Sequence, residues 1–273
     1  SPGSLPNPLR VVFSSAAKEA ARNHAQELKS SHSDVVIAEG ESGAARILSA
    51  EAADLVARLT PADEALDLPL IEDIVAPEHD TVAIFYSGDG GWRDIDQRVS
   101  ARLNEKGLPV IGVDALRYFW SEKSPEATAT DLSAMIAHYR KRLGVSKVVL
   151  IGYSFGANIL PKVYGLLPET DRKSVTLLSL LALSHQADFE IVLGSWVGVT
   201  GPAKHGDPVD HLIEVEASKV QCVYGLEEED SGCPALEPRT KQGLQLIPRP
   251  GGHHFDENYE LVADRILERI VGR

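Results

Sequence analysis

The sequence predicts an α/β protein whose mostly parallel β-sheet is covered by helices on both faces. From residue 81 onward, apolar runs of strand length alternate with longer amphipathic stretches. This alternation is typical of parallel strands joined by helices. The 273 residues, 43% hydrophobic and 25% charged, are enough to bury the core of one such domain, with or without a small appendage.

The first 75 residues predict a β-α-β-α segment. Its strands are expected at 9–13 and 35–38, and its helices at 16–29 and 43–59. The segment either extends the main sheet or is the tail of a preceding domain. Residues 61–80 are rich in Pro, Asp and Glu and are the predicted linker, so the main domain is expected to span 76–273.

The main domain is predicted to contain six strands and four helices. The strands are expected at 81–86, 109–113, 147–152, 174–183, 219–224 and 244–247. The helices are expected at 92–106, 125–143, 156–166 and 256–271, with Gly107 and Gly144 ending the first two. The less periodic stretch 184–217 is interpreted as an insertion before the penultimate strand.

Composition excludes several classes of function. The formal net charge of −13 repels phosphate backbones, and no basic run with interleaved aromatic residues offsets it, so nucleic acid is not expected as a partner. No apolar stretch reaches the roughly 18 to 20 residues that span a bilayer. The chain begins Ser-Pro-Gly-Ser without a basic-then-apolar leader, so we expect a mature or trimmed form.

The strongest motif is Gly152-Tyr153-Ser154-Phe155-Gly156, which lies between a predicted strand and a predicted helix. This context favours a nucleophile elbow, a sharp turn that exposes a serine hydroxyl at the carboxyl end of the sheet. The alternative, a serine in a purely structural turn, does not explain the pattern as well. The motif therefore predicts the α/β-hydrolase fold with Ser154 as the nucleophile.

A serine nucleophile needs a base, which in this fold comes late in the chain. His253 and His254 follow two glycines, after the last predicted strand and before the C-terminal helix. We favour His253 as the base and keep His254 as the second choice. The other seven histidines lack this setting and are interpreted as surface or core residues.

The acid that orients the histidine should follow the penultimate strand, where the run Glu227-Glu228-Glu229-Asp230 lies. Asp230 is favoured because the run from Asp230 to Pro234 has the Asp-to-Pro spacing common in hydrolase acid loops. Glu228 is the alternative, since it better matches the spacing from Gly225. The remaining carboxylates are interpreted as a solvated acidic loop.

The loop 87–92, with sequence SGDGGW, follows the strand at 81–86 and is expected to supply the oxyanion hole. The backbone N–H of Asp89 or Gly90 would join that of Phe155. A phosphate-binding loop is the rival interpretation, but neither a dinucleotide fingerprint nor a Walker motif is present. We therefore expect no nucleotide or other cofactor.

Arg117 follows the strand at 109–113 and is a candidate for contact with an anionic head group, although the pattern alone favours a structural pair with Asp114. No metal-ligand spacing is visible, so no metal is expected. Cys222 and Cys233 are eleven positions apart, a separation that permits a disulfide but also fits two unrelated buried thiols.

Four separated motifs occur in an order that resembles the bacterial VirJ/AcvB virulence-protein family. They are SGDGGW at 87–92, DALRYFW at 114–120, GYSFGAN at 152–158 and GGHHFD at 251–256. The resemblance covers residues 75–273 and implies an α/β-hydrolase domain in the bacterial periplasm. It also implies that residues 1–75 end a preceding hydrolase-type domain, and it favours the Cys222–Cys233 bridge, because the periplasm is oxidising.

The resemblance further implies a substrate and partners. AcvB-like members are linked to hydrolysis of aminoacyl-phosphatidylglycerol, and VirJ-like members to type IV secretion, so an aminoacyl phospholipid and secretion-system proteins are the expected partners. Glu227 and Glu228 would attract the ammonium of a lysyl group. Two alternatives remain: a non-enzymatic periplasmic adaptor for secretion, and an esterase or thioesterase for a soluble substrate.

Overall fold

The computed structural model describes residues 9–14, 16–32, 35–39, 66–191 and 204–271. The chain divides into two compact units, residues 1–65 and 66–273. The predicted helix at 43–59 lies outside the described residues.

The first unit contains a β-α-β arrangement that comprises β1 (Leu9–Phe13), α1 (Glu19–Ser31) and β2 (Val35–Glu39). The two strands pair in parallel and form a sheet of their own. Phe13, Ala25 and Val35 are its buried apolar residues among those described. Among the described residues these strands pair only with each other, and the expectation that the segment is the tail of a preceding domain stays a prediction.

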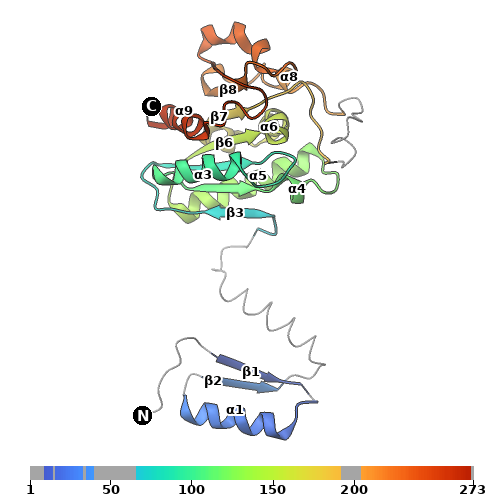
Figure 1. Ribbon diagram of the computed structural model, residues 1–273, viewed down its shortest axis with the longest axis vertical. Coiled ribbons are helices and arrows are strands. Elements are labelled where there is room, and N and C mark those ends of the chain that lie inside the picture. Colours follow the sequence, from blue (N-terminus) through green and yellow to red (C-terminus); the bar gives the residue numbers. More distant parts are fainter. Residues whose placement is uncertain (1–8, 15, 33–34, 40–65, 192–203, 272–273) are drawn as a thin grey trace. The chain divides into compact units, whose positions relative to one another are not determined.

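The second unit is built on a seven-stranded sheet (Figure 1). In chain order its strands are β3 (Leu70–Asp73), β4 (Thr81–Tyr86), β5 (Val110–Val113), β6 (Lys147–Tyr153), β7 (Val175–Leu181), β8 (Val220–Gly225) and β9 (Gln245–Arg249). Their spatial order is β3-β5-β4-β6-β7-β8-β9, and β3 alone runs antiparallel to its neighbour. The prediction of a mostly parallel sheet is confirmed.

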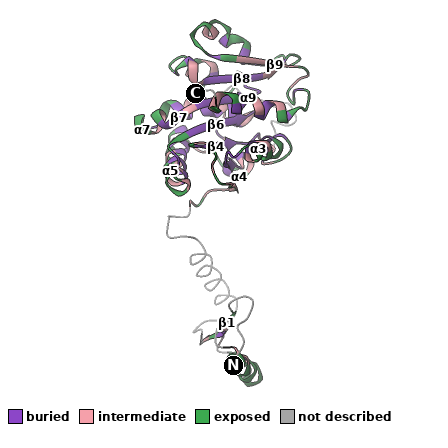
Figure 2. Cartoon of the chain, turned by 90° about the vertical axis from the view of Figure 1, so that its left-hand side faces the viewer, coloured by how far each residue is buried: buried purple, intermediate pink, exposed green. Residues whose placement is uncertain are grey.

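Helices cover both faces of this sheet, as predicted. On one face, α3 (Ile95–Glu105) packs beside α9 (Tyr259–Val271). On the other, α5 (Pro125–Leu143) packs beside α6 (Phe155–Leu166). Successive strand residues alternate between the two resulting core clusters because side chains on a strand point to opposite faces. Figure 2 shows the sheet as the buried centre, with exposed residues on the outer helix surfaces.

Helix α5 illustrates how closely local sequence signals define an element. Its observed bounds are those predicted from the sequence. Ser124 caps the first turn by accepting a hydrogen bond from the backbone N–H of Ala127, and Pro125 occupies the first helical position, where its missing N–H costs nothing. Gly144 ends the helix with φ +66°, a left-handed conformation that glycine adopts without strain.

The predicted linker at 61–80 requires a correction. Leu66, Leu68 and Leu70 alternate along the chain and pack against the core, and residues 70–73 form β3, which pairs with β5. Such alternation is the pattern of a half-buried strand, and the surrounding Pro and acidic residues concealed it. The second unit therefore begins at residue 66 and not at residue 76.

Several short elements were not predicted from the sequence. They are α4 (Ala115–Tyr118), α7 (Glu169–Ser174), α8 (Pro208–His211) and the 3₁₀ helices η2 (Ala217–Lys219) and η3 (Cys233–Gln242). Helix α8 lies within the predicted insertion at 184–217, of which residues 192–203 lie outside the described residues.

Candidate active site

Ser154 occupies a strained turn between β6 and α6, at the carboxyl end of the central strand. Its backbone has φ +51° and ψ −113°, which is unusual for a residue with a side chain. Its backbone N–H donates to the carbonyl oxygen of Leu181 on β7, at 2.8 Å. The turn has the form of a nucleophile elbow, in which strain holds the serine hydroxyl above the sheet edge.

The two glycines of the motif allow this turn to pack. A β-carbon on Gly152 would lie 2.5 Å from the backbone of Gly156, and one on Gly156 would lie 2.2 Å from the carbonyl oxygen of Tyr86. Both distances are shorter than any real contact between such atoms. Any larger residue at either position would therefore push α6 away from β4 and β6.

His253 lies on the loop between β9 and α9 with its ring directed at Ser154. Its Nε2 atom is 2.8 Å from Oγ of Ser154, within hydrogen-bond distance. Gly251 has φ +83°, and a β-carbon there would lie 2.1 Å from the carbonyl oxygen of Phe255. This tight loop positions the ring beside the nucleophile, and Phe255, which is buried, anchors the loop in the core.

The acid position is occupied by Glu228, the alternative from the sequence, and not by Asp230. Nδ1 of His253 lies 2.5 Å from Oε1 of Glu228, whose side chain is only 10% exposed. Asp230 is exposed. The preference for Asp230 is therefore corrected. It rested on the spacing to Pro234, but residues 233–242 form η3, so Pro234 belongs to a helical turn rather than to an extended acid loop.

Backbone contacts explain why Glu228 reaches the histidine. A β-carbon on Gly225, the last residue of β8, would lie 2.1 Å from the carbonyl oxygen of Gly252, so the two loops touch there. The N–H of Glu227 donates to the carbonyl of Gly251 at 2.9 Å, and the N–H of Glu228 donates to the carbonyl of Gly225 at 3.2 Å. The chain turns tightly after Gly225 and carries the third residue beyond it to His253.

The loop after β4 passes beside the nucleophile. A β-carbon on Gly88 would lie 3.7 Å from Cβ of Ser154 and 3.2 Å from the ring of Tyr153. Gly90 packs instead against Arg93, whose Nε donates to the carbonyl of Gly90 at 2.7 Å. The structure therefore brings this loop close to the turn that carries Ser154, with Gly88 as the loop residue nearest to it by this measure. The roles of Asp89, Gly90 and Phe155 as oxyanion donors stay predictions.

His254, the second choice for the base, points elsewhere. Its Nδ1 atom lies 3.1 Å from the hydroxyl of Tyr153, and its ring is nearly perpendicular to that of His253. Tyr153 was not singled out in the sequence. The signal was present, since the residue before an elbow serine ends a central strand beside the histidine loop.

The remaining candidates for substrate binding, Arg117 and Glu227, lie at the same sheet edge, and both are exposed. Arg117 is 79% exposed, its Nε lies 3.6 Å from Asp114, and the carboxylate of Asp114 also accepts the backbone N–H of Arg117. This is the structural pair that the sequence allowed. Glu227 is exposed, and the structure brings it to the histidine loop through its backbone.

Cys222 and Cys233 form a disulfide, which decides between the two interpretations that the sequence left open. Both residues are fully buried. The bridge joins β8 to the start of η3, so it closes the loop that carries Glu228.

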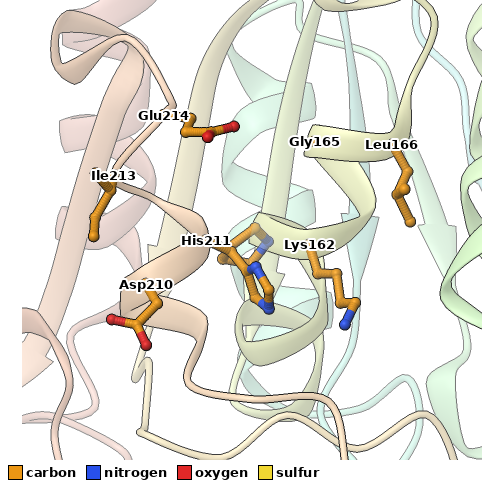
Figure 3. A pocket seen from close by; sticks show the side chains of 8 residues that line it. Lys162, Gly165, Leu166, Asp210, His211, Ile213 and Glu214 are labelled. Carbon is orange, nitrogen blue, oxygen red and sulfur yellow. The ribbon is translucent and has the colours of Figure 1, made fainter.

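The described ranges contain neither a candidate metal site nor a candidate membrane span. They hold no cluster of three or more His, Cys, Asp or Glu residues arranged for a metal ion, and none of their helices is long and apolar enough to cross a bilayer. A separate hollow of about 440 Å³ lies between α6 and the α8 region (Figure 3). Its lining includes Lys162, Leu166, Asp210, His211, Ile213 and Glu214, and no residue of the Ser154 site.

The fold and the arrangement of Ser154, His253 and Glu228 define the second unit as an α/β-hydrolase domain. The chain belongs to the family of bacterial virulence proteins called VirJ, whose family model matches residues 80–273. This confirms the family seen in the four motifs. No curated protein matches the chain significantly.

Solved structures share the fold at low sequence identity. Est1E from Butyrivibrio proteoclasticus is 20% identical with a TM-score of 0.52, and the match covers 74% of this chain and 93% of that one. A lipase-esterase related protein from Clostridium acetobutylicum is 14% identical with a TM-score of 0.50, and the match covers 76% of this chain and 100% of the other. These likenesses support the hydrolase fold.

Proposed function

We propose that this protein is a serine hydrolase that cleaves a carboxylic ester. The observation that carries the proposal is the continuous hydrogen-bonded chain from Ser154 Oγ to His253 Nε2 and from His253 Nδ1 to Glu228. A serine hydroxyl is a weak nucleophile until a base accepts its proton, and the base needs a third group to orient it. All three groups are present in the required order.

The reaction proceeds in two halves. Ser154 Oγ attacks the ester carbonyl carbon while its proton passes to Nε2 of His253, and Glu228 stabilises the resulting imidazolium. The backbone N–H of Phe155 and the loop beside Gly88 stabilise the oxyanion. The imidazolium then protonates the departing alcohol oxygen, leaving an acyl-Ser154. Water, deprotonated by His253, attacks this ester, releases the acid and restores the serine.

The proposed substrate is an aminoacyl-phosphatidylglycerol, most specifically the lysyl form, and the proposed compartment is the periplasm. The likeness of the four motifs to AcvB-like proteins supports the substrate. The exposed carboxylate of Glu227 and the net charge of −13 would favour a cationic lysyl group. The Cys222–Cys233 bridge supports an oxidising compartment. Contact with secretion-system proteins is proposed on family grounds alone.

The test is hydrolysis of lysyl-phosphatidylglycerol in mixed micelles, followed by free lysine, with p-nitrophenyl acetate as a second substrate. Ser154→Ala is expected to lower kcat by about four to six orders of magnitude on both. Ser146→Ala is the matched control, because Ser146 precedes β6 at the opposite end of the same strand and its hydroxyl contacts Asp80.

Three outcomes distinguish the proposed hydrolase activity from the proposed lipid substrate. Turnover of both substrates by the wild type and Ser146→Ala, but not by Ser154→Ala, would support the nucleophile and the substrate. Turnover of p-nitrophenyl acetate alone would keep the hydrolase and replace the lipid by a soluble ester. No turnover of either by the wild type would contradict the enzyme and favour the secretion adaptor.

A further inference from the structure

Tyr153 contacts both loops that flank the nucleophile. It is the last residue of β6, it directly precedes Ser154, and it is 6% exposed. Its ring centroid lies 5.4 Å from that of His253, and a β-carbon on Gly88 would lie only 3.2 Å from the ring. The ring therefore lies between two loops. One is the loop that carries His253, residues 250–258, which we call the base loop, and the other is the expected oxyanion loop, residues 87–92.

The hydroxyl of Tyr153 meets only the base loop among the contacts described. It lies 3.4 Å from the carbonyl oxygen of His253, to which it donates, and 3.1 Å from Nδ1 of His254. One arrangement satisfies both contacts: the hydroxyl donates to the carbonyl and accepts from the Nδ1–H of His254. Burial raises the pKa of Tyr153, and the nearby Tyr259, Asp96, Glu228 and Asp89 raise it further, so the hydroxyl keeps its proton.

The base loop needs such a support. The side chain of His253 is 43% exposed, and the loop contains two adjacent glycines, Gly251 and Gly252. Glu228 and Ser154 contact the two ring nitrogens of His253, but neither contact holds the backbone from which the ring projects. A further contact to the backbone of His253 fixes the position from which the ring projects.

From these contacts we infer that Tyr153 is a positioning residue, which holds the loop of His253 so that Nε2 is directed at Ser154. The inference rests on the proposed function, since it assigns Tyr153 a role toward the proposed base. A phenylalanine would fill the same space, so what the tyrosine adds is its hydroxyl, and both partners of that hydroxyl belong to the base loop.

The first test compares Tyr153→Phe with Tyr139→Phe on p-nitrophenyl acetate. Tyr139 is the matched control: it is also buried, its hydroxyl donates to Glu72 at 2.6 Å, and it lies on α5 away from the site. We expect Tyr153→Phe to lower kcat about tenfold with KM unchanged, as for one lost hydrogen bond of about 1.4 kcal/mol. Tyr139→Phe should leave kcat as in the wild type.

A double-variant cycle with His254→Ala tests whether the Tyr153 hydroxyl acts through the base loop. If the hydroxyl acts through this loop, Tyr153→Phe/His254→Ala should be no slower than Tyr153→Phe alone. Wild-type kcat in Tyr153→Phe, or equal losses in Tyr153→Phe and Tyr139→Phe, would overturn the inference.

A second readout does not depend on turnover. The proton shared by Nδ1 of His253 and Glu228 should give a low-field proton NMR signal, which Tyr153→Phe should broaden or shift while Tyr139→Phe leaves it unchanged. If the wild type hydrolyses no ester, the proposed function fails, and this signal alone then tests whether Tyr153 positions the His253 loop. An unchanged signal in Tyr153→Phe would then overturn its positioning role.

Discussion

At the scale of single residues, the site depends on close backbone approaches as much as on the three reactive side chains. Gly152 and Gly156 let the elbow pack, Gly225 lets the acid and base loops meet, and Gly251 lets the base loop close on Phe255. The sequence predicted the positions of Ser154 and His253, because each lies in a motif with local constraints. The acid could not be chosen in this way, since its position depends on how the chain turns after Gly225.

We predict that Glu228→Gln lowers kcat on p-nitrophenyl acetate by about 10⁴-fold, the cost of the corresponding acid-to-amide change in a serine protease triad. The amide keeps the size of the side chain but cannot stabilise the imidazolium of His253. Asp230→Asn is the matched control and should retain wild-type kcat, because Asp230 is exposed and lies outside the hydrogen-bonded chain. The reverse order of effects would restore Asp230 as the acid.

At the scale of elements, the sequence predicted the strands and helices that have strong periodicity or clear caps. The strand at 81–86 and the helix at 125–143 have the predicted bounds. Helix α3 begins at Ile95, three residues later than predicted, because Trp92 packs edge-on against Phe85 instead of opening the helix. Elements without apolar periodicity, such as η3, could not be predicted, because tertiary contacts and the disulfide define them.

The Cys222–Cys233 disulfide is expected to stabilise the loop that carries Glu228. Closing a loop of eleven positions restricts the unfolded chain, and the Cys222→Ala/Cys233→Ala variant should lose about 3 kcal/mol of unfolding free energy in urea. Its kcat should also fall, because Glu228 lies inside the closed loop.

The control for cavity effects is the wild type unfolded with and without a reducing agent, which changes the bridge and leaves the sequence intact. An unchanged urea midpoint after reduction would show that packing around Cys222 and Cys233, and not their bond, holds the loop.

At the scale of the whole molecule, the unfolding of the second unit can be measured separately from that of the first. The sequence has no tryptophan in residues 1–65, so tryptophan fluorescence reports the unfolding of the hydrolase domain and not that of the first unit. The pH dependence of that unfolding depends on which acids the domain buries. Asp96 on α3 is 2% exposed, and its Oδ1 has no hydrogen-bond partner among the described residues.

Burial raises the pKa of Asp96 to about 8, and the carboxylates of Asp114 and Asp94 contribute to the rise, against a hydrogen bond from the backbone of Arg93. In the unfolded chain the group titrates near 3.8. Between these values the folded domain holds a proton that the unfolded chain releases, so its stability falls as pH rises from about 4 to 8.

We therefore predict that Asp96→Asn, which cannot ionise, flattens this decline by up to about 1.4 kcal/mol per pH unit. The measurement is the unfolding free energy from tryptophan fluorescence in urea at several pH values. Subtracting the wild-type curve from that of the variant removes the contribution of every other carboxylate. The difference should grow from pH 5 to pH 8 in favour of the variant. Parallel curves would show that Asp96 is ionised in the folded domain, which would require a cationic or hydrogen-bonding partner for Oδ1.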